Sequence, residues 1–300
     1  MKILSLLSII LFSINASIAG GVNASDDDYR KTFLRISGGY GFRTGIGTNY
    51  QVHHNEDGTR TYTPLAGSYG KGFNLAVAGV HMFSDNVGLE LGFSYLSGGR
   101  TEINHFFIDR QYNVYINQRR LIKANILRVS PAIFVCSGMN KDVNVYAKFG
   151  LVYGWATATW DLYEDYTWFN GAKGKGEYQW KITGGQGLGY TSSLGIIFNT
   201  PEPSLKFFAE INYIGQGVTF KKGTRTKSKI NGQSNLNNLS TQYKEFVYAD
   251  NETVDPCTDR NPNQDPNQPS RYAKFKSNFD SIGLNIGIVV KIGKHVKWIE

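Results

Sequence analysis

Eight amphipathic segments, separated by alternately long and short connections, constrain the fold of this 300-residue chain more than any other feature. Within each segment, apolar side chains alternate with polar or small ones, which is the period of a β-strand with one apolar face. In the hairpin 73–95, for example, Leu89 and Leu91 share one face while Glu90 lies on the other. The expected strands are residues 32–44, the two arms of 73–95, 125–135, 143–159, 186–198, 205–215 and 279–292.

The connections between these segments run long, short, long, short, long, short, long. That rhythm predicts an all-β fold, an eight-stranded antiparallel up-and-down transmembrane β-barrel, because such barrels alternate short periplasmic turns with longer outer loops. A soluble β-sandwich is the alternative, but its strands are commonly shorter than the roughly ten residues that cross a bilayer. We expect a barrel over residues 32–292, with extracellular loops at 45–69, 98–120, 160–185 and 216–274.

The N-terminus has the pattern of a secretory signal peptide. Lys2 precedes an apolar run, and the small residues Ser17 and Ala19 occupy the −3 and −1 positions of a cleavage site after Ala19. An uncleaved anchor is the alternative, but the run is shorter than the ~20 residues of a spanning helix. We therefore predict a signal peptide at residues 1–19, a short periplasmic leader at 20–31 and a periplasmic tail at 293–300.

Composition agrees with an exported β-protein. The mean hydropathy of −0.32 argues against a helical membrane protein. The two cysteines, Cys136 and Cys257, fall at opposite ends of the expected barrel, so we predict two unpaired thiols. A net charge of +8 fits either an ordinary solvated surface or an affinity for anionic partners such as lipid phosphates, while the chain carries no basic-aromatic motif that would indicate nucleic acid.

Several charged residues fall on the polar faces of the strands, which a barrel turns inward: Arg35, Glu90, Arg128, Lys148, Glu210 and Lys291. An eight-stranded barrel has an interior just wide enough for side chains, and buried ions must pair. We expect a lumen cluster of Glu90, Arg128 and Lys148, on three successive strands, with Glu210 joining from across the lumen. A polar core that plugs the barrel is the favoured interpretation, and a gate for small solutes is the alternative.

A basic run opens the last long connection. Its cations are Lys221, Lys222, Arg225, Lys227 and Lys229. A merely solvated run is the favoured interpretation. The alternative is that, outside a Gram-negative cell, these cations meet the phosphates of lipopolysaccharide, which attract cations.

The sequence gives little support to catalysis. No spacing links a histidine to a serine and an acid, as a nucleophilic site requires. No ligand set for a metal is evident either. We therefore predict no enzyme, no metal and no cofactor.

Five segments resemble the strands of OmpA-like outer-membrane β-barrel proteins, the outer membrane protein beta-barrel domain group. They are SDNVGLELGFSYL, NILRVSPAIFV, VYAKFGLVYG, FFAEINY and SIGLNIGIVVKI. The resemblance spans residues 32–292 and implies a barrel in the bacterial outer membrane, placed there by the outer-membrane assembly machinery. It implies no peptidoglycan tether, because no such domain follows residue 292, and the chain ends in Trp298-Ile299-Glu300 rather than in a terminal aromatic residue.

The expected function is that of a non-enzymatic integral outer-membrane β-barrel protein. Its role would be structural or one of surface interaction, through extracellular loops that meet an extracellular ligand or surface. The alternative is a small, porin-like channel for ions or small apolar molecules.

Overall fold

A computed structural model describes residues 32–44, 50–54, 60–64, 68–109, 112–137, 142–202, 204–250 and 265–292. The predicted signal peptide, leader and C-terminal tail lie outside these residues. The fold is all-β, as predicted, and the strands join in one sixteen-stranded sheet. Its eight main strands are β1 (Thr32–Arg43), β4 (Gly72–Met82), β5 (Val87–Gly98), β7 (Val114–Cys136), β8 (Val143–Trp168), β9 (Lys173–Asn199), β10 (Leu205–Thr219) and β16 (Ser281–Lys291).

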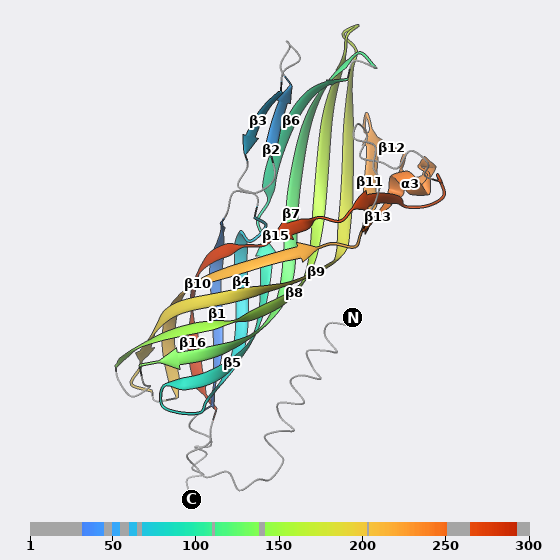
Figure 1. Ribbon diagram of the computed structural model, residues 1–300. Coiled ribbons are helices and arrows are strands. Elements are labelled where there is room, and N and C mark those ends of the chain that lie inside the picture. The colour runs from blue at the N-terminus through green and yellow to red at the C-terminus, as the bar shows by residue number, and fades with distance from the viewer. Residues whose placement is uncertain are drawn as a thin grey trace, which may run out of the picture.

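The eight main strands pair in a ring. Each is antiparallel to its two neighbours in the order β1, β4, β5, β7, β8, β9, β10 and β16. β16 then pairs with β1, from Phe33 opposite Lys291 to Arg43 opposite Ser281. The tilted ring occupies the lower left of Figure 1.

The predicted eight-stranded barrel describes the ring but not the whole sheet. The ring strands are very unequal in length, and β7, β8 and β9 continue far beyond the others toward the top of Figure 1. Eight further strands extend the sheet at that outer end: β2 (Tyr50–His54), β3 (Arg60–Pro64), β6 (Thr101–Asp109), β11 (Lys222–Ile230), β12 (Gln233–Ser234), β13 (Glu245–Ala249), β14 (Ser270–Ala273) and β15 (Lys276–Asn278).

The predicted long loops are therefore largely strand. Residues 160–185 form the paired ends of β8 and β9, and residues 98–120 contain β6 and the start of β7. Residues 216–274 hold the end of β10, β11 to β14, a 3-10 helix η1 (Leu236–Asn238) and a short helix α3 (Thr241–Lys244). Tyr, Thr and Trp are frequent in the extensions of β8 and β9, and these residues favour strands. We call this outer part of the sheet the outer sheet.

The short connections follow the prediction more closely. β4 turns into β5 through residues 83–86, where the Phe83 amide donates to the Val87 carbonyl at 2.8 Å and the Ser84 hydroxyl accepts from the Val87 amide at 3.1 Å. β1 begins and β16 ends at this same end of the ring, since Thr32 lies opposite His81 and Phe33 opposite Lys291. We call this end, with its short turns, the inner end.

Pro131 interrupts the pairing of β7 with β8 locally but produces no bulge. Pro131 lies opposite Leu91 of β5 in regular register. On its other side, pairing with β8 is interrupted between Val129 and Ala132 and then resumes in the same register. A proline has no backbone N–H to donate, so it removes a ladder bond without inserting a residue.

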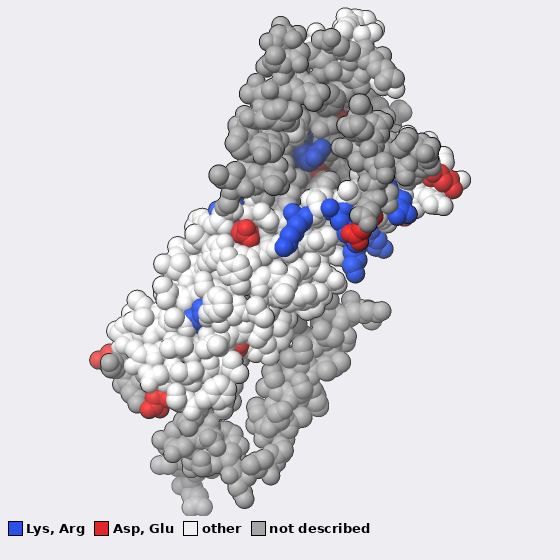
Figure 2. Space-filling model, in the orientation of Figure 1, with Lys and Arg blue, Asp and Glu red and all other residues white. Residues whose placement is uncertain are grey.

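Two apolar cores fill the ring, and an apolar belt covers its outside. The inner core includes Phe33, Phe134 and Val289, and the outer core includes Ile126, Val218 and Phe279. Outward-facing side chains are also apolar but exposed, such as Leu75 at 67% and Ile286 at 72%. Figure 2 shows the resulting wall, almost free of charged atoms, with Lys and Arg gathered at its outer end.

No helix in the described part of the chain has the length and apolar character that a membrane span needs. Cys136 is an unpaired, buried thiol whose Sγ lies 3.5 Å from the carbonyl oxygen of Asp85. Cys257 lies outside the described residues, so the predicted pair of free thiols stays a prediction.

Candidate functional site in the barrel lumen

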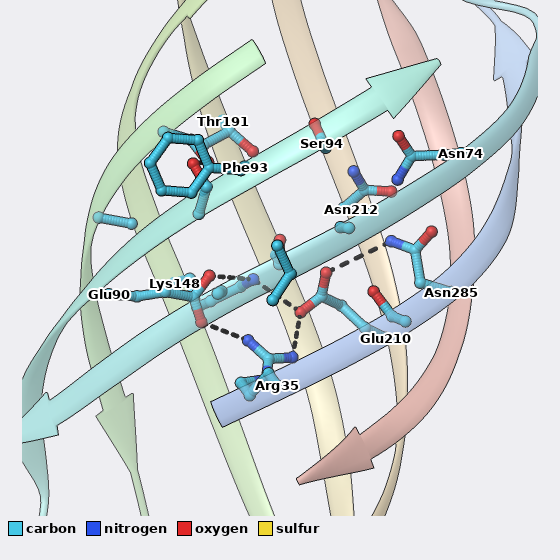
Figure 3. Close-up of a pocket in the computed structure, with 18 of the residues that line it drawn as sticks. Arg35, Asn74, Glu90, Phe93, Ser94, Lys148, Thr191, Glu210, Asn212 and Asn285 are labelled. Carbon is cyan, nitrogen blue, oxygen red and sulfur yellow. Dashed lines mark hydrogen bonds and ion pairs between the residues drawn. The ribbon is translucent and has the colours of Figure 1, made fainter. Parts of the chain in front are cut away.

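Four charged side chains meet in the lumen at the level between the two apolar cores. Arg35 comes from β1, Glu90 from β5, Lys148 from β8 and Glu210 from β10. Strand alternation turns all four inward, as the sequence predicted. They form a closed set of two cations and two anions, which we call the lumen cluster (Figure 3).

Every cation of the lumen cluster contacts both anions. Arg35 donates to Glu90 at 2.5 Å and to Glu210 at 2.8 Å. Lys148 donates to Glu90 at 2.8 Å and to Glu210 at 2.9 Å. Because each acid has two basic partners, the buried charges are compensated, which is the condition under which burial of ions is tolerated.

Neutral groups complete the coordination of the lumen cluster. The Tyr146 hydroxyl donates to Glu210 at 2.8 Å and accepts from Arg35 at 2.5 Å. Asn285 Nδ2 donates to the other oxygen of Glu210 at 3.4 Å. The Arg35 guanidinium also lies over the Phe208 ring, 4.2 Å from its centroid, where cation–π attraction adds to the ion pairs.

The lumen cluster leaves little free space. The cavity beside it measures about 70 Å³, enough for a few water molecules at most. Phe134 and Tyr146 stack below it toward the inner end with ring centroids 5.0 Å apart. On the other side, the outer core fills the ring with buried Leu96, Ile126 and Phe279. The described lumen is therefore filled by an apolar, a charged and again an apolar layer.

Arg128 does not join the lumen cluster, although the sequence suggested it as a partner of Glu90. It lies opposite Ser94, whereas Glu90 lies opposite Ala132, four residues further along β7. At about 3.4 Å per residue this separates the two side chains by roughly 14 Å. Arg128 instead donates to Gln216 Oε1 at 2.9 Å and to the Phe279 carbonyl at 3.2 Å.

Arg35 is the member of the lumen cluster that sequence reasoning missed. Its alternation placed it inside, but the expected cluster took its cations, Arg128 and Lys148, from the two strands that follow that of Glu90. Closure of the ring brings β1 beside β16 and within reach of β10. Lys291, the last predicted inward charge, is exposed at the inner end.

The predicted basic run forms part of the outer sheet instead of a free loop. Lys222 begins β11, and Arg225 lies over Trp180 at 4.3 Å. Lys227 donates to Glu177 at 2.6 Å, and this hydrogen bond lowers the pKa of the Glu177 carboxyl and raises the pKa of Lys227. Arg225, Lys227 and Lys229 are partly exposed, so among the cations of the run only Lys221 and Lys222 are fully exposed.

Four exposed lysines do line up on the outward face, just beyond the apolar belt. Lys123 of β7 lies opposite Thr159 of β8, which lies opposite Lys181 of β9. The Lys221 amide donates to the Thr183 carbonyl, and Lys276 of β15 lies opposite Thr219 of β10. Strand pairing thus sets these lysines, which we call the lysine arc, along one rim. The arc consists of Lys123, Lys181, Lys221 and Lys276.

No group of His, Cys, Asp and Glu side chains suited to a metal ion occurs among the described residues. The arrangement in the lumen therefore offers ion pairing and packing, and its two acids are occupied by cations of the chain itself.

Comparisons with known proteins assign no family. No family model matches the chain, and no curated protein does. Among solved structures it is similar to Neisserial surface protein A, at 10% identity and a TM-score of 0.38 over 87% of this chain and 97% of that one.

Two further solved structures have similar values. The outer membrane protein OprG from Pseudomonas aeruginosa has 11% identity and a TM-score of 0.43 over 88% of this chain and 96% of that one. Ail, the attachment invasion locus protein of Yersinia pestis, has 14% identity and a TM-score of 0.26 over 86% and 99%. The OmpA-like resemblance thus stays a prediction.

Proposed function

We propose that this chain is a non-enzymatic integral protein of the bacterial outer membrane, in which a closed, non-conducting barrel holds the outer sheet at the cell surface. The filled lumen carries this proposal. Two apolar layers and a neutral set of ion pairs occupy the positions that a channel would keep open. The function would then reside in the outer sheet, as a structural or surface-interaction protein.

The apolar belt supports a membrane setting. Soluble monomers rarely expose contiguous apolar patches beyond a few hundred Å². Here outward side chains of every ring strand are apolar and exposed, among them Ile36, Leu75, Leu91, Ile133, Phe149, Leu194, Ile211 and Leu284. A bilayer satisfies such a surface, and ring closure leaves no unpaired strand edge in the hydrocarbon.

The lysine arc fits the outer headgroup level of such a membrane. Val135 near the inner end and Lys123 at the arc are 12 residues apart on β7. That is about 40 Å along the strand, or about 30 Å along the membrane normal for a strand tilted by roughly 40°. A hydrocarbon core is about 30 Å thick, so the arc would meet lipopolysaccharide phosphates.

Planar-bilayer recording of the refolded protein tests the closed lumen. We expect no discrete current steps from the unmodified protein, because ions cannot pass the paired charges and the two apolar layers without unfolding them. Heat-modifiable gel mobility of the same sample verifies that the barrel is folded. Regular unitary steps from folded protein would contradict the proposal and favour the small-channel alternative.

Neutralising the lysine arc tests the lipid contact. Replacing Lys123, Lys181, Lys221 and Lys276 with glutamine is expected to reduce lipid A retained in native mass spectrometry several-fold, since each cation near an anionic surface contributes about 1 kcal/mol. Lys173, Lys175, Lys227 and Lys229, on the far parts of β9 and β11, give a matched control with the same change in charge. Equal losses for the two variants would show a net-charge effect only and would contradict a contact at the arc.

A further inference from the structure

An aromatic cavity lies at the outer mouth of the ring, beyond the outer core. Its volume is about 450 Å³, within the range of small-molecule sites. Its walls come from β7, β8 and β9 on one side and from β13, β14 and the residues after β14 on the other. The lining residues are Arg120, Trp160, Leu162, Trp180, Phe246, Tyr248, Tyr272, Ala273 and Phe275.

The aromatic rings form a connected set. Phe246 contacts Trp180 and Tyr272, with ring centroids 5.4 and 5.5 Å away. Tyr248 contacts Phe275 edge-on at 5.3 Å. Such rings offer flat, rigid apolar surface that loses little conformational entropy when a ligand binds. The cavity is therefore suited to an apolar body.

Arg120 gives this apolar cavity one positive charge. Strand alternation turns it inward, on the same face of β7 as the buried Ile122 and Ala124. Its guanidinium lies 5.8 Å from the centroid of the Trp160 ring. Within the described residues it forms no ion pair or hydrogen bond with an acid, unlike Arg35 in the lumen cluster.

The carboxylate whose field acts on Arg120 is that of Glu164. This carboxylate accepts hydrogen bonds from Gln118 Nε2 at 2.5 Å and from the Tyr166 hydroxyl instead. Burial lowers the pKa of the Arg120 guanidinium, against the fields of Tyr69, Glu164 and Tyr248. Arginine nevertheless stays protonated at neutral pH, so the cavity keeps a mostly buried cation that lacks an anion.

We propose that this cavity binds a small amphipathic carboxylate, with the carboxylate on Arg120 and the apolar body among the aromatic rings. A guanidinium matches a carboxylate through two parallel hydrogen bonds, which add geometric specificity as well as binding energy. An apolar body of up to roughly drug size fits the volume. The site is separate from the lumen cluster, so it would stand even if the barrel proved to conduct.

Titration calorimetry on the full chain in phosphatidylcholine nanodiscs tests the site, with empty nanodiscs subtracted. The probe is naphthalene-2-carboxylate, and naphthalen-2-ylmethanol is its neutral counterpart. We expect saturable 1:1 binding of the carboxylate, at least tenfold tighter than the alcohol. Equal affinity of the unmodified protein for the two probes, or no saturable binding of the carboxylate, would overturn the proposal before any variant is made.

Two arginine variants then locate the charge. Arg120→Gln is expected to weaken binding of the carboxylate at least tenfold. Its affinity for the alcohol should stay within about twofold of that of the unmodified protein, which would also show that the cavity is intact. Arg119→Gln is the matched control, because Arg119 is the adjacent residue, exposed on the opposite face over Tyr163. An unchanged carboxylate affinity in Arg120→Gln, or an equal loss in both variants, would contradict the role of Arg120.

Discussion

Glu210→Ala is expected to lower the free energy of unfolding by about 3–5 kcal/mol, the usual cost of breaking a buried ion pair from one side. The reason lies in the number of its partners. Glu210 accepts from Arg35, Lys148 and Tyr146, so its removal leaves the lumen cluster with two cations and only one acid. Urea unfolding in lipid vesicles, followed by tryptophan fluorescence, measures the loss.

Glu177→Ala provides the matched control for this substitution. Glu177 also forms an ion pair, with Lys227 at 2.6 Å, but the pair is exposed to solvent on the outer sheet. Solvent and salt screen such pairs, so the control should unfold at the same urea concentration as the unmodified protein. If the two variants lost equal stability, the lumen cluster would not be the buried, compensated network described above.

Leu194→Arg is expected to lower the free energy of unfolding by about 2–4 kcal/mol, or to prevent insertion into vesicles altogether. The reason is that it places a charge on the lipid-facing side near the middle of the bilayer. Leu194 is 67% exposed, and its neighbour Gly195 lies opposite Glu210 at the level of the lumen cluster. Folding yield into vesicles and urea titration measure the effect.

The same substitution on a water-exposed strand separates the membrane from other causes. Gln233→Arg adds the same charge to β12, where Gln233 is exposed beyond the belt. Its free energy of unfolding should stay within about 0.5 kcal/mol of that of the unmodified protein, as for most surface substitutions. A neutral Leu194→Arg would mean that the apolar belt faces water or a protein partner, and would contradict the membrane setting.

Alternation alone predicted most of the ring correctly. The positions of β1, β4, β5 and β16, and the inward direction of Arg35, Glu90 and Glu210, follow from a period of two residues. Strand alternation is local, so it can be recognised without knowing which strands pair. This part of the fold needed no long-range information.

The outer sheet could not be predicted in the same way. In the extensions of β8 and β9, neither face is consistently apolar, since both contact water or other parts of the outer sheet. Tyr166, for instance, reaches Tyr178 across the β8–β9 hairpin, a contact that depends on the register of the two strands. Polar, glycine-rich segments of this kind have the composition of loops although pairing makes them strands.

Which charged residues join the lumen cluster depends on the height of each residue along the barrel axis. This height cannot be read from residue numbers. Glu90 and Arg128 lie on neighbouring strands and share an inward face, yet four residues of register separate their levels. Arg35, distant in sequence from both acids, lies at the correct level because the ring closes between β16 and β1. The register between paired strands and the shear of the barrel set these heights, and strand alternation does not reveal either of them.

Spin-label accessibility along β10 tests the closed membrane barrel most directly. Single labels at residues 205–209 and 211–214, in a background without the two native cysteines, are exposed in vesicles to oxygen and to a water-soluble nickel chelate. We expect Phe207, Ala209 and Ile211 to be reached by oxygen only, and Phe208 and Ile214 by neither reagent. Nickel access at Phe208 and Ile214 would contradict the filled lumen, and nickel access at Phe207, Ala209 and Ile211 would contradict the membrane.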